Sequence, residues 1–290
     1  MATTKTAAKR KPLVSWVEGR RFVNPIIYLI AIVVVAANLA PAAFIIVGGF
    51  KSNSEMTVDP AGLPGEWRWS NYLYVLQSSS FWQQMGNSLF VAVITTFGVV
   101  SLGLMASFVL ARYRFRGSNA LYSLFAAGLM FPLTVAITPL YTLVKTLGLV
   151  NNLWGIIIPQ IAFGLPMTII ILVPFLRAIP REIEEAALVD GCSRLGFFWQ
   201  MVLRLSVPGV ITVGIMTFVN SWNSYMLPLF ILMDEENFTV PLGVQSFHSA
   251  YSQDTAMVLA YTSLSMLPAL IFFSLFERRI VGGLTGAVKG

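Results

Sequence analysis

Six long apolar segments dominate this sequence and constrain its fold more than any other feature. Because a helix rises 1.5 Å per residue and the hydrocarbon core of a bilayer is about 30 Å thick, a crossing needs roughly 20 mostly apolar residues. The segments that meet this condition are 25–50, 88–111, 120–140, 153–176, 205–233 and 255–276. Only 11% of the residues are charged, whereas soluble domains have about a quarter. The sequence therefore predicts an all-α integral membrane protein of six transmembrane helices, the fifth long enough to tilt or to bend near Pro228. Prolines are expected to break or kink the third and fourth helices: Pro132, Pro139, Pro159, Pro166 and Pro174.

The distribution of basic residues predicts how these helices are oriented. If the N-terminus is cytoplasmic, sixteen of the nineteen Lys and Arg residues fall on the cytoplasmic side, and those outside are Lys51, Arg68 and Lys145. By the positive-inside rule we expect a cytoplasmic tail at 1–24, a transmembrane domain at 25–277 and a second cytoplasmic tail at 278–290. The first apolar segment is longer than that of a signal peptide, so we expect an uncleaved anchor. Topology accounts for the net charge of +6, which predicts no nucleic-acid partner.

The titratable residues exclude several classes of chemistry. Cys192 and His248 are the only cysteine and histidine, too few for a disulfide framework, a metal cage or a Ser-His-Asp site. No Gly-Lys pair occurs, so a Walker-type phosphate loop is excluded. We therefore predict no catalytic residue, no metal site and no cofactor bound by this chain. All thirteen acidic residues fall in predicted loops, which argues against an ion-coupled secondary carrier or channel and against an intramembrane enzyme, the two alternatives from other classes.

The predicted loop at 178–204 carries the most informative motif, "REIEEAALVDGCSR". A short helix is predicted to start at Pro180 because proline suits the first helical position and carboxylates in the first turn complement the helix dipole. Those carboxylates are Glu182, Glu184 and Glu185. Gly191 is suited to the left-handed conformation that ends a helix, and Ser193 to capping a second helix that begins at Arg194. The alternative is an amphipathic connector that rests on the lipid surface.

The same loop resembles a known signature. "EAALVDG", nine residues and then "MVLRLSVP" are similar to the EAA motif of binding-protein-dependent ABC importer permeases. In that family the loop forms coupling helices that dock on the ATPase subunits. The resemblance implies that the ATPase-coupling residues are Glu185, Ala186, Ala187, Asp190, Gly191, Arg194 and Leu203. Met201 stands for the isoleucine of the motif, and Arg204 replaces its proline, which puts the bend before the fifth span in doubt.

The C-terminal "FERRIVGGLTGAVKG" resembles the maltose-type (MalG-like) carbohydrate branch of the same family. In the maltose permease this tail reaches between the two ATPase subunits, which implies contacts by Gly283, Leu284, Thr285 and Lys289. Because the tail is rich in glycine, we expect it to be non-helical, and either disordered or held by a partner.

The resemblance also implies the fold and the partners. It implies a bundle like that of type I ABC importer permeases, in the inner or plasma membrane of a prokaryotic cell. Two ABC ATPase subunits would bind ATP and Mg, and a second homologous permease would complete the path through the membrane. An extracytoplasmic solute-binding protein would deliver a sugar. The segment at 51–84 is either a docking surface for that protein or a solvated loop with interfacial aromatic residues. A non-sugar solute remains the alternative cargo.

Uncharged polar and aromatic residues within the spans are candidates for the solute path, because sugars offer hydroxyl groups to hydrogen-bond and flat faces to stack on. The densest group lies in "FVNSWNSYMLPL", where Asn220, Asn223 and Ser224 are spaced to share one helix face. Trp222 is expected to face elsewhere, such as a neighbouring subunit. The candidate set is Asn87, Asn220, Trp222, Asn223, Ser224 and Tyr225, with Ser88, Thr134 and Thr138 as weaker members. The alternative is that these side chains only join helices to each other.

Overall fold

The structure is a computed structural model that describes residues 25–247 and 254–287, except for the side chains of 273 and 275–287. All regular elements in this part of the chain are helices, so the all-α prediction is confirmed. The chain divides into two units, Met1–Phe44 and Ile45–Gly290.

Helix α1 (Pro25–Gly48) supplies the described part of the first unit and continues a few residues into the second. Its apolar side chains are exposed on every side, from Ile26 at 59% to Leu39 at 60%. A helix that is apolar all round is typical of a membrane span.

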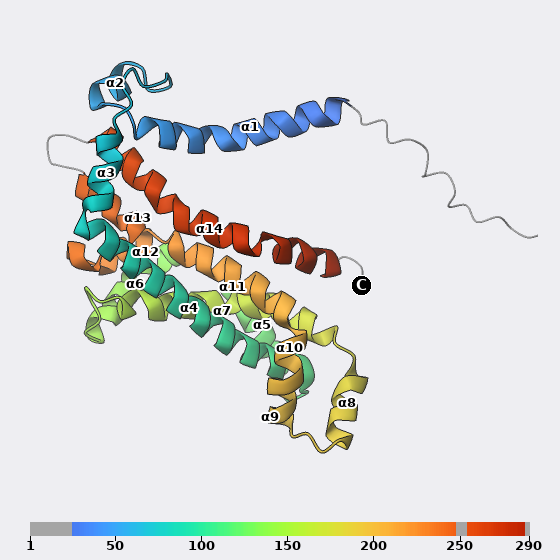
Figure 1. The fold of residues 1–290 in the computed structure, drawn as a ribbon. Helices are drawn as coiled ribbons and strands as arrows, with labels where there is room; N and C mark the ends of the chain where they lie inside the picture. Colours follow the sequence, from blue (N-terminus) through green and yellow to red (C-terminus); the bar gives the residue numbers. More distant parts are fainter. Residues whose placement is uncertain (1–24, 248–253, 288–290) are drawn as a thin grey trace, which may run out of the picture. The chain divides into compact units, whose positions relative to one another are not determined.

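The second unit consists of helices joined by short turns (Figure 1). Those before the coupling motif are α2 (Asn53–Val58), α3 (Trp69–Gln77), α4 (Ser79–Arg112), α5 (Ser118–Gly128), α6 (Leu133–Thr146) and α7 (Trp154–Arg177). Those at the motif are α8 (Arg181–Val189), α9 (Arg194–Phe197), a π-helical turn (Phe198–Val202) and α10 (Leu203–Leu205). Those after it are α11 (Val207–Trp222), α12 (Met226–Ile231), α13 (Val240–Gly243) and α14 (Thr255–Ala287), with 3₁₀ turns at Glu235–Asn237 and Val244–Phe247.

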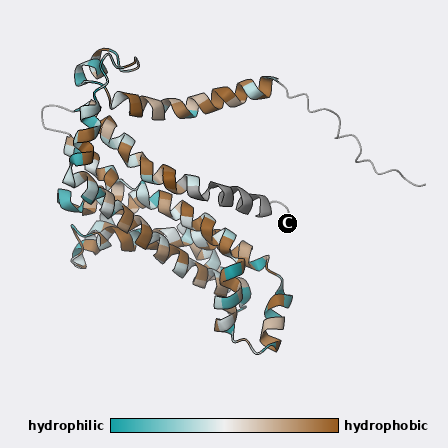
Figure 2. Cartoon of the chain, in the orientation of Figure 1, coloured by the Kyte–Doolittle hydropathy of each residue, from teal (hydrophilic) through white to brown (hydrophobic). Residues whose placement is uncertain are grey.

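Four of the described helices are long and apolar enough to cross a membrane unaided: α1, α4, α7 and α14. Two further crossings are possible if each of two bent helix pairs, α5 with α6 and α9–α10 with α11, is one span. Hydrophobic residues predominate along α1, α4 and α11 (Figure 2). The presence of several membrane helices is confirmed, while the count of six and the orientation stay predictions.

The third predicted span, 120–140, is broken at Pro132, one of the prolines expected to break or kink it. Helix α5 ends at Gly128, α6 begins at Leu133, and the two meet at 101°. Pro132 lies at this break with an extended backbone, φ −73° and ψ 137°. Proline lacks an N–H donor and disfavours a helical conformation in the residue before it, which explains why the helix stops here.

The fourth and fifth spans differ from expectation in opposite ways. Helix α7 keeps Pro159, Pro166 and Pro174 inside one helix, although we expected these prolines to break or kink it. The fifth segment is interrupted between Trp222 and Met226, before the expected bend near Pro228. Asn223 and Ser224 lie at this break. Short polar side chains such as these can hydrogen-bond to the nearby backbone and so compete with helical hydrogen bonds.

Helix α4 lies at the centre of the second unit and packs against both α7 and α11. Close approach to α7 depends on Gly103, since a Cβ atom there would lie 2.3 Å from the Thr168 Cγ2 atom. Small residues at such crossings allow the backbones of membrane helices to approach each other. One apolar cluster joins the ends of α4 and α7 to α8 and α9 through Phe108, Leu176 and Phe197.

The C-terminal glycine-rich segment does not follow the expectation of a non-helical tail. Helix α14 continues through Ala287, and its last turns contain Gly282, Gly283 and Gly286. Each glycine costs only about 1 kcal/mol in a helix, and extending an existing helix avoids the cost of nucleation. A long preceding helix therefore explains the difference.

Candidate functional site

The motif at 181–205 folds as a helix, a glycine corner and a second helix, as its sequence predicts. Helix α8 carries Glu182 and Glu184 in its first turn, and Pro180 precedes it as the N-cap rather than as its first residue. Gly191 has a φ of +81°, the left-handed conformation that glycine adopts without strain. The Ser193 hydroxyl accepts a hydrogen bond of 3.0 Å from the backbone N–H of Gly196 and so caps α9.

The inner face of α8 is fixed to the transmembrane helices by one ion pair and an apolar contact. Arg112, the last residue of α4, lies 3.8 Å from the Glu184 carboxylate and donates a 3.0 Å hydrogen bond to the carbonyl of Ile179. The side chain of Arg112 is only 3% exposed, and buried pairs of this kind are costly to break. Ala187 is buried in the same cluster as Phe197. A displacement of α8 would therefore be passed directly to the end of α4.

The outer face of the segment is open. Val189 is 86% exposed, although a valine of a folded domain is usually buried. The predicted coupling residues divide between the two faces. Ala187 is buried, whereas those exposed are Glu185, Ala186, Asp190, Gly191, Arg194 and Leu203. Leu188 is also exposed, at 45%, so the outer face of α8 presents two adjacent apolar side chains beside its carboxylates.

Arg204 does not remove the bend that the proline of the motif was expected to provide. The segment 194–205 and α11 meet at 73°, with Ser206 between them. The Ser206 hydroxyl donates a hydrogen bond to the Val202 carbonyl, and Pro208 lies in the first turn of α11, where proline is well tolerated. The bend before the fifth span is therefore present in this chain despite the departure from the motif.

The predicted tail contacts are only partly within the described residues. Gly283, Leu284 and Thr285 lie in the helical backbone of α14, and Lys289 lies outside the described residues. Their contact with an ATPase stays a prediction.

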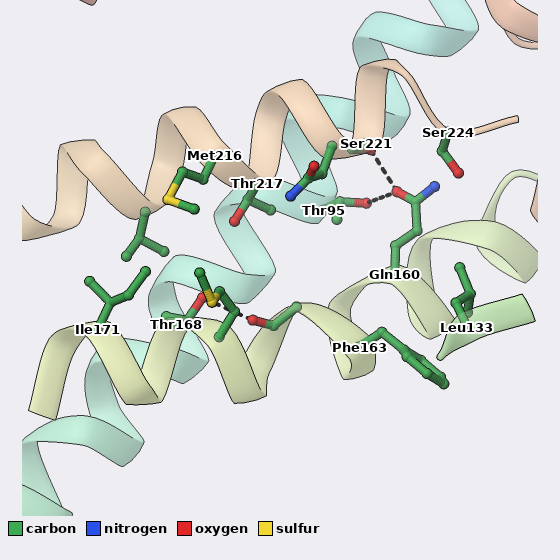
Figure 3. Close-up of a pocket in the computed structure, with 14 residues that line it drawn as sticks. Thr95, Leu133, Gln160, Phe163, Thr168, Ile171, Met216, Thr217, Ser221 and Ser224 are labelled. Atoms are coloured by element: carbon green, nitrogen blue, oxygen red, sulfur yellow. Dashed lines mark hydrogen bonds between the residues drawn. The ribbon is translucent and has the colours of Figure 1, made fainter. Parts of the chain in front are cut away.

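A cavity of about 190 Å³ lies between α4, α7 and α11 (Figure 3). Its polar lining comes from Thr95 on α4, from Gln160 and Thr168 on α7, from Thr217, Asn220 and Ser221 on α11, and from Ser224, which follows α11. None of the described residues that line it carries a charge. The lining therefore offers hydroxyl and amide groups, which suit a neutral solute rich in hydrogen-bonding groups.

Gln160 is the central polar residue of this cavity. Its Oε1 atom accepts hydrogen bonds from the Ser221 hydroxyl at 2.6 Å and from the Thr95 hydroxyl at 3.3 Å (Figure 3). Its Nε2 atom is buried and has no hydrogen-bond partner among the residues that the structure describes. One amide thus joins three helices and keeps two unused donors, an arrangement that costs free energy unless another state or a ligand supplies an acceptor.

Gln160 is not among the residues predicted for the solute path. Those residues form clusters of polar side chains in the sequence, whereas Gln160 is isolated among apolar neighbours in "IIIPQIAF". Its isolation could have identified it as a candidate, because a lone amide in the middle of a membrane helix is expected to face other helices or a cavity.

The residues predicted for the solute path are not all brought together. Asn220 and Ser224 line the central cavity, but Trp222 and Asn223 line another, of about 410 Å³, between α11, α13 and α14. Because α11 ends at Trp222, helical spacing no longer applies at Asn223. Trp222 is 4% exposed and its ring lies 6.0 Å from that of Phe218, so it packs inside this chain rather than facing a neighbour.

The remaining candidates form hydrogen bonds with the segment at 236–245. The Asn87 amide donates to the carbonyls of Glu236 and Phe238, at 2.8 and 3.0 Å, and the Tyr225 hydroxyl accepts from Gln245 at 2.8 Å. Ser88 accepts a 2.7 Å hydrogen bond from the backbone of Val240. The weaker candidates Thr134 and Thr138 are exposed on α6. A contact of these residues with solute stays a prediction.

Comparison with known families assigns the chain. A family model described as the binding-protein-dependent transport system inner membrane component matches residues 99–281, which include α7, the coupling segment and α11. The chain belongs to this family. It is thus an integral inner-membrane permease component of a bacterial ABC transport system, and the family is one of transporters rather than enzymes.

Similar permeases cover nearly the whole chain. The diacetylchitobiose uptake system permease protein NgcG of Streptomyces coelicolor is 32% identical over 249 residues, 85% of this chain and 82% of that protein. The trehalose transport system permease protein SugB of Mycobacterium tuberculosis is 33% identical over 260 residues, 89% and 94% of the two chains. The sulfoquinovosyl glycerol transport system permease protein SmoH of Agrobacterium fabrum is 30% identical over 287 residues, 98% and 99% of the two chains.

The fold of the permease is also that of a solved structure. A chain of a bacterial ABC transporter involved in the import of the acidic polysaccharide alginate superposes with a TM-score of 0.76 at 21% identity. The match covers 89% of this chain and 96% of that one. At this identity it establishes the shared fold of an ABC importer permease.

Proposed function

We propose that this permease forms half of the transmembrane path of an ATP-driven sugar importer. The observation that carries the proposal is the uncharged cavity between α4, α7 and α11, in a chain whose relatives are named for diacetylchitobiose, trehalose and sulfoquinovosyl glycerol. Hydroxyl and amide groups recognise a sugar without the ionisable residues that an ion-coupled carrier keeps in its membrane helices.

The energy would come from partner subunits through the segment at 181–205. Two ABC ATPases that bind ATP and Mg would close around the exposed face of α8, which carries Glu185, Ala186 and Val189. Because Arg112 joins α8 to the end of α4, movement of α8 would carry α4 with it. Helix α4 contributes Thr95 to the cavity, so the same movement would open or close the cavity.

A second permease is part of the proposal. The described residues line it from α4, α6, α7 and α11, and a sugar path enclosed on all sides needs walls from another subunit. We propose a homologous permease as that subunit, and an extracytoplasmic binding protein that delivers the sugar. A structural neighbour, a bacterial alginate transporter, is described in complex with a pentasaccharide-bound periplasmic protein.

Purification of the permease with its co-purifying subunits, followed by reconstitution into vesicles with the extracytoplasmic binding protein on the sugar side, tests the proposal. We expect ATP-dependent uptake of at least one radiolabelled sugar from a panel of diacetylchitobiose, trehalose and maltose, and no uptake by the permease alone. ATP-dependent uptake of an amino acid or phosphate with none of any sugar would refute the sugar assignment. Accumulation by the permease without ATPase subunits would refute the whole proposal.

A further inference from the structure

An apolar groove lies where α4 ends beside α9. It has a volume of about 450 Å³, and its lining residues are Met105, Phe108, Val109, Tyr113, Arg194, Leu195 and Phe198. Five of these are apolar, and the two others, Tyr113 and Arg194, carry polar ends. The groove is separate from the central cavity, with which it shares no lining residue.

One wall of this groove belongs to a helix that meets the criteria for a membrane span. Met105 and Val109 lie within the last two turns of α4 and are 46% and 42% exposed. From Met105 to Arg112, where α4 ends, is about 10 Å along the helix axis. The groove therefore begins on the last turns of a helix that is long and apolar enough to span a membrane, and it continues onto Leu195 of α9, which is 69% exposed.

The polar end of the groove carries positive charge. The Arg194 guanidinium lies 5.2 Å from the centre of the Tyr113 ring, and Arg114 and Arg116 are exposed in the turn that follows. Helix α8 places the Glu184 carboxylate near this end of the groove, but that carboxylate is already paired with Arg112. Among the described residues, no salt bridge joins the arginines at 114, 116 and 194 to a carboxylate.

Tyr113 supplies a neutral hydroxyl at the same place. Burial raises the pKa of its phenol and the Glu184 carboxylate raises it further, while Arg194 and Arg112 oppose the shift. The hydroxyl therefore stays protonated at neutral pH and is available as a hydrogen-bond donor.

We propose that this groove binds one anionic phospholipid. An acyl chain would lie against Met105, Val109 and Phe198, and the phosphate would meet Arg194 and the Tyr113 hydroxyl, with Arg114 and Arg116 adding attraction. Charge complementarity selects the headgroup, since basic residues at a membrane surface attract anionic lipid. A lipid is favoured over a protein because the apolar wall belongs to a helix that is long and apolar enough to span a membrane, and its exposed side chains lead directly to a basic end.

The bound lipid would join the coupling segment to the membrane. Arg194 is the first residue of α9, and Leu195 and Phe198 follow it, so a lipid in the groove would contact both α9 and α4. The position of the coupling segment would then depend on lipid composition as well as on the Arg112–Glu184 pair.

Photolabelling of the full permease with its co-purifying subunits, in phosphatidylcholine nanodiscs, tests this proposal. Trace photoactivatable phosphatidylglycerol or phosphatidylcholine is added, and labelled peptides are identified by mass spectrometry. Phosphatidylglycerol should label 105–113 and 194–198 at least about fivefold more than phosphatidylcholine does, since a single arginine at the surface contributes that factor. Labelling is the readout because Arg194 also belongs to the predicted coupling set, so a failure of sugar transport would not affect the result.

Matched variants separate a lipid site from general surface charge. Arg194→Gln should lower phosphatidylglycerol labelling about fivefold and leave phosphatidylcholine labelling unchanged. Arg204→Gln, which removes an exposed arginine from the same segment but outside the groove, should change neither. Val109→Phe should reduce labelling by both lipids, because the larger ring fills the groove. Should Arg194→Gln fail to fold, loss of the wild-type preference at about 0.5 M salt provides the same test.

Three outcomes would overturn the proposal. The first is equal labelling of the groove by the two lipids, and the second is an equal loss of labelling in Arg194→Gln and Arg204→Gln. The third is a groove that neither lipid labels until the partner subunits are removed, which would assign it to a protein partner.

Discussion

The coupling segment and the central cavity are built in opposite ways. The segment at 181–205 consists of short helices with an exposed outer face, and its ion pair to the transmembrane helices is that of Arg112 with Glu184. The cavity lies between three long helices and is held by uncharged hydrogen bonds that meet at Gln160. The first is suited to receiving a force at its surface, and the second to rearranging a few polar contacts around a solute.

This difference predicts how substitutions should act. In the segment, backbone geometry and one ion pair carry the function, so changes there should uncouple ATP hydrolysis from transport. In the cavity, the hydrogen bonds are neutral and individually modest, so changes there should alter solute dependence and leave coupling intact.

The largest effect is expected for Gly191→Pro. Proline requires a φ near −65°, whereas Gly191 has +81°, and its N–H donates a 3.1 Å hydrogen bond to the Leu188 carbonyl. The corner should open at a cost of about 3 kcal/mol, which lowers ATP-dependent uptake roughly a hundredfold. ATP hydrolysis should continue, and membrane insertion should be normal. Uptake and hydrolysis are measured together in vesicles.

Gly148→Pro is the matched control for this change. Gly148 also has a positive φ, +68°, and also has open space around its Cβ position, but it lies in the turn after α6. Its replacement should strain that turn and leave hydrolysis coupled to uptake. Equal uncoupling by the two variants would show that strain anywhere in the chain is sufficient and would remove the special role of the corner.

Arg112→Met should have the next largest effect. It leaves Glu184 without its partner and removes the 3.0 Å hydrogen bond to Ile179, and breaking a buried pair costs about 3 kcal/mol. We expect a lower unfolding temperature and weaker coupling. Glu182→Gln, an exposed change in the first turn of α8, should alter stability by less than about 0.5 kcal/mol. A double-mutant cycle of Arg112→Met with Glu184→Gln should show strong coupling, and additive effects would contradict the proposed link.

Gln160→Met should act on the cavity instead. The variant keeps the side-chain length but removes the acceptor for Thr95 and Ser221 and both Nε2 donors. We expect the half-saturating solute concentration to rise about tenfold, equivalent to roughly 1.4 kcal/mol, with the ATP hydrolysed per solute unchanged. Uptake is measured with a sugar that the wild-type complex transports.

The double variant Thr95→Val with Ser221→Ala is its control. It removes the same contacts between helices but keeps the Gln160 donors. If Gln160 only joins helices, the two variants should lose similar stability and leave solute dependence unchanged. A larger effect of Gln160→Met on solute dependence would place the amide in the solute path.

The two regions also differ in how far the sequence predicts them. Gly191 and Ser193 act through their own backbone and their nearest neighbours, so the helix, corner and helix could be predicted from residue types alone. The break at Pro132 depends on an equally local rule, the restriction that proline places on the helix before it, and the sequence predicts it as well. The contacts of Gln160 depend on how α4, α7 and α11 pack, which no local pattern contains. The prediction that Asn223 shares a helix face with Asn220 is wrong, because α11 ends at Trp222, one residue before Asn223.

The smallest effect is expected for Asn220→Ala, which tests whether the cavity or the helix interface governs solute dependence. Asn220 lines the cavity but is exposed, and water can replace a bond that it makes to a solute. We therefore expect the half-saturating solute concentration to rise only about threefold, or roughly 0.6 kcal/mol, with no change in unfolding temperature. Asn223→Ala, on the other cavity, is the matched control and should leave uptake unchanged. A larger effect of Asn223→Ala would move the solute path to the cavity between α11, α13 and α14 and would make Gln160 a contact between helices.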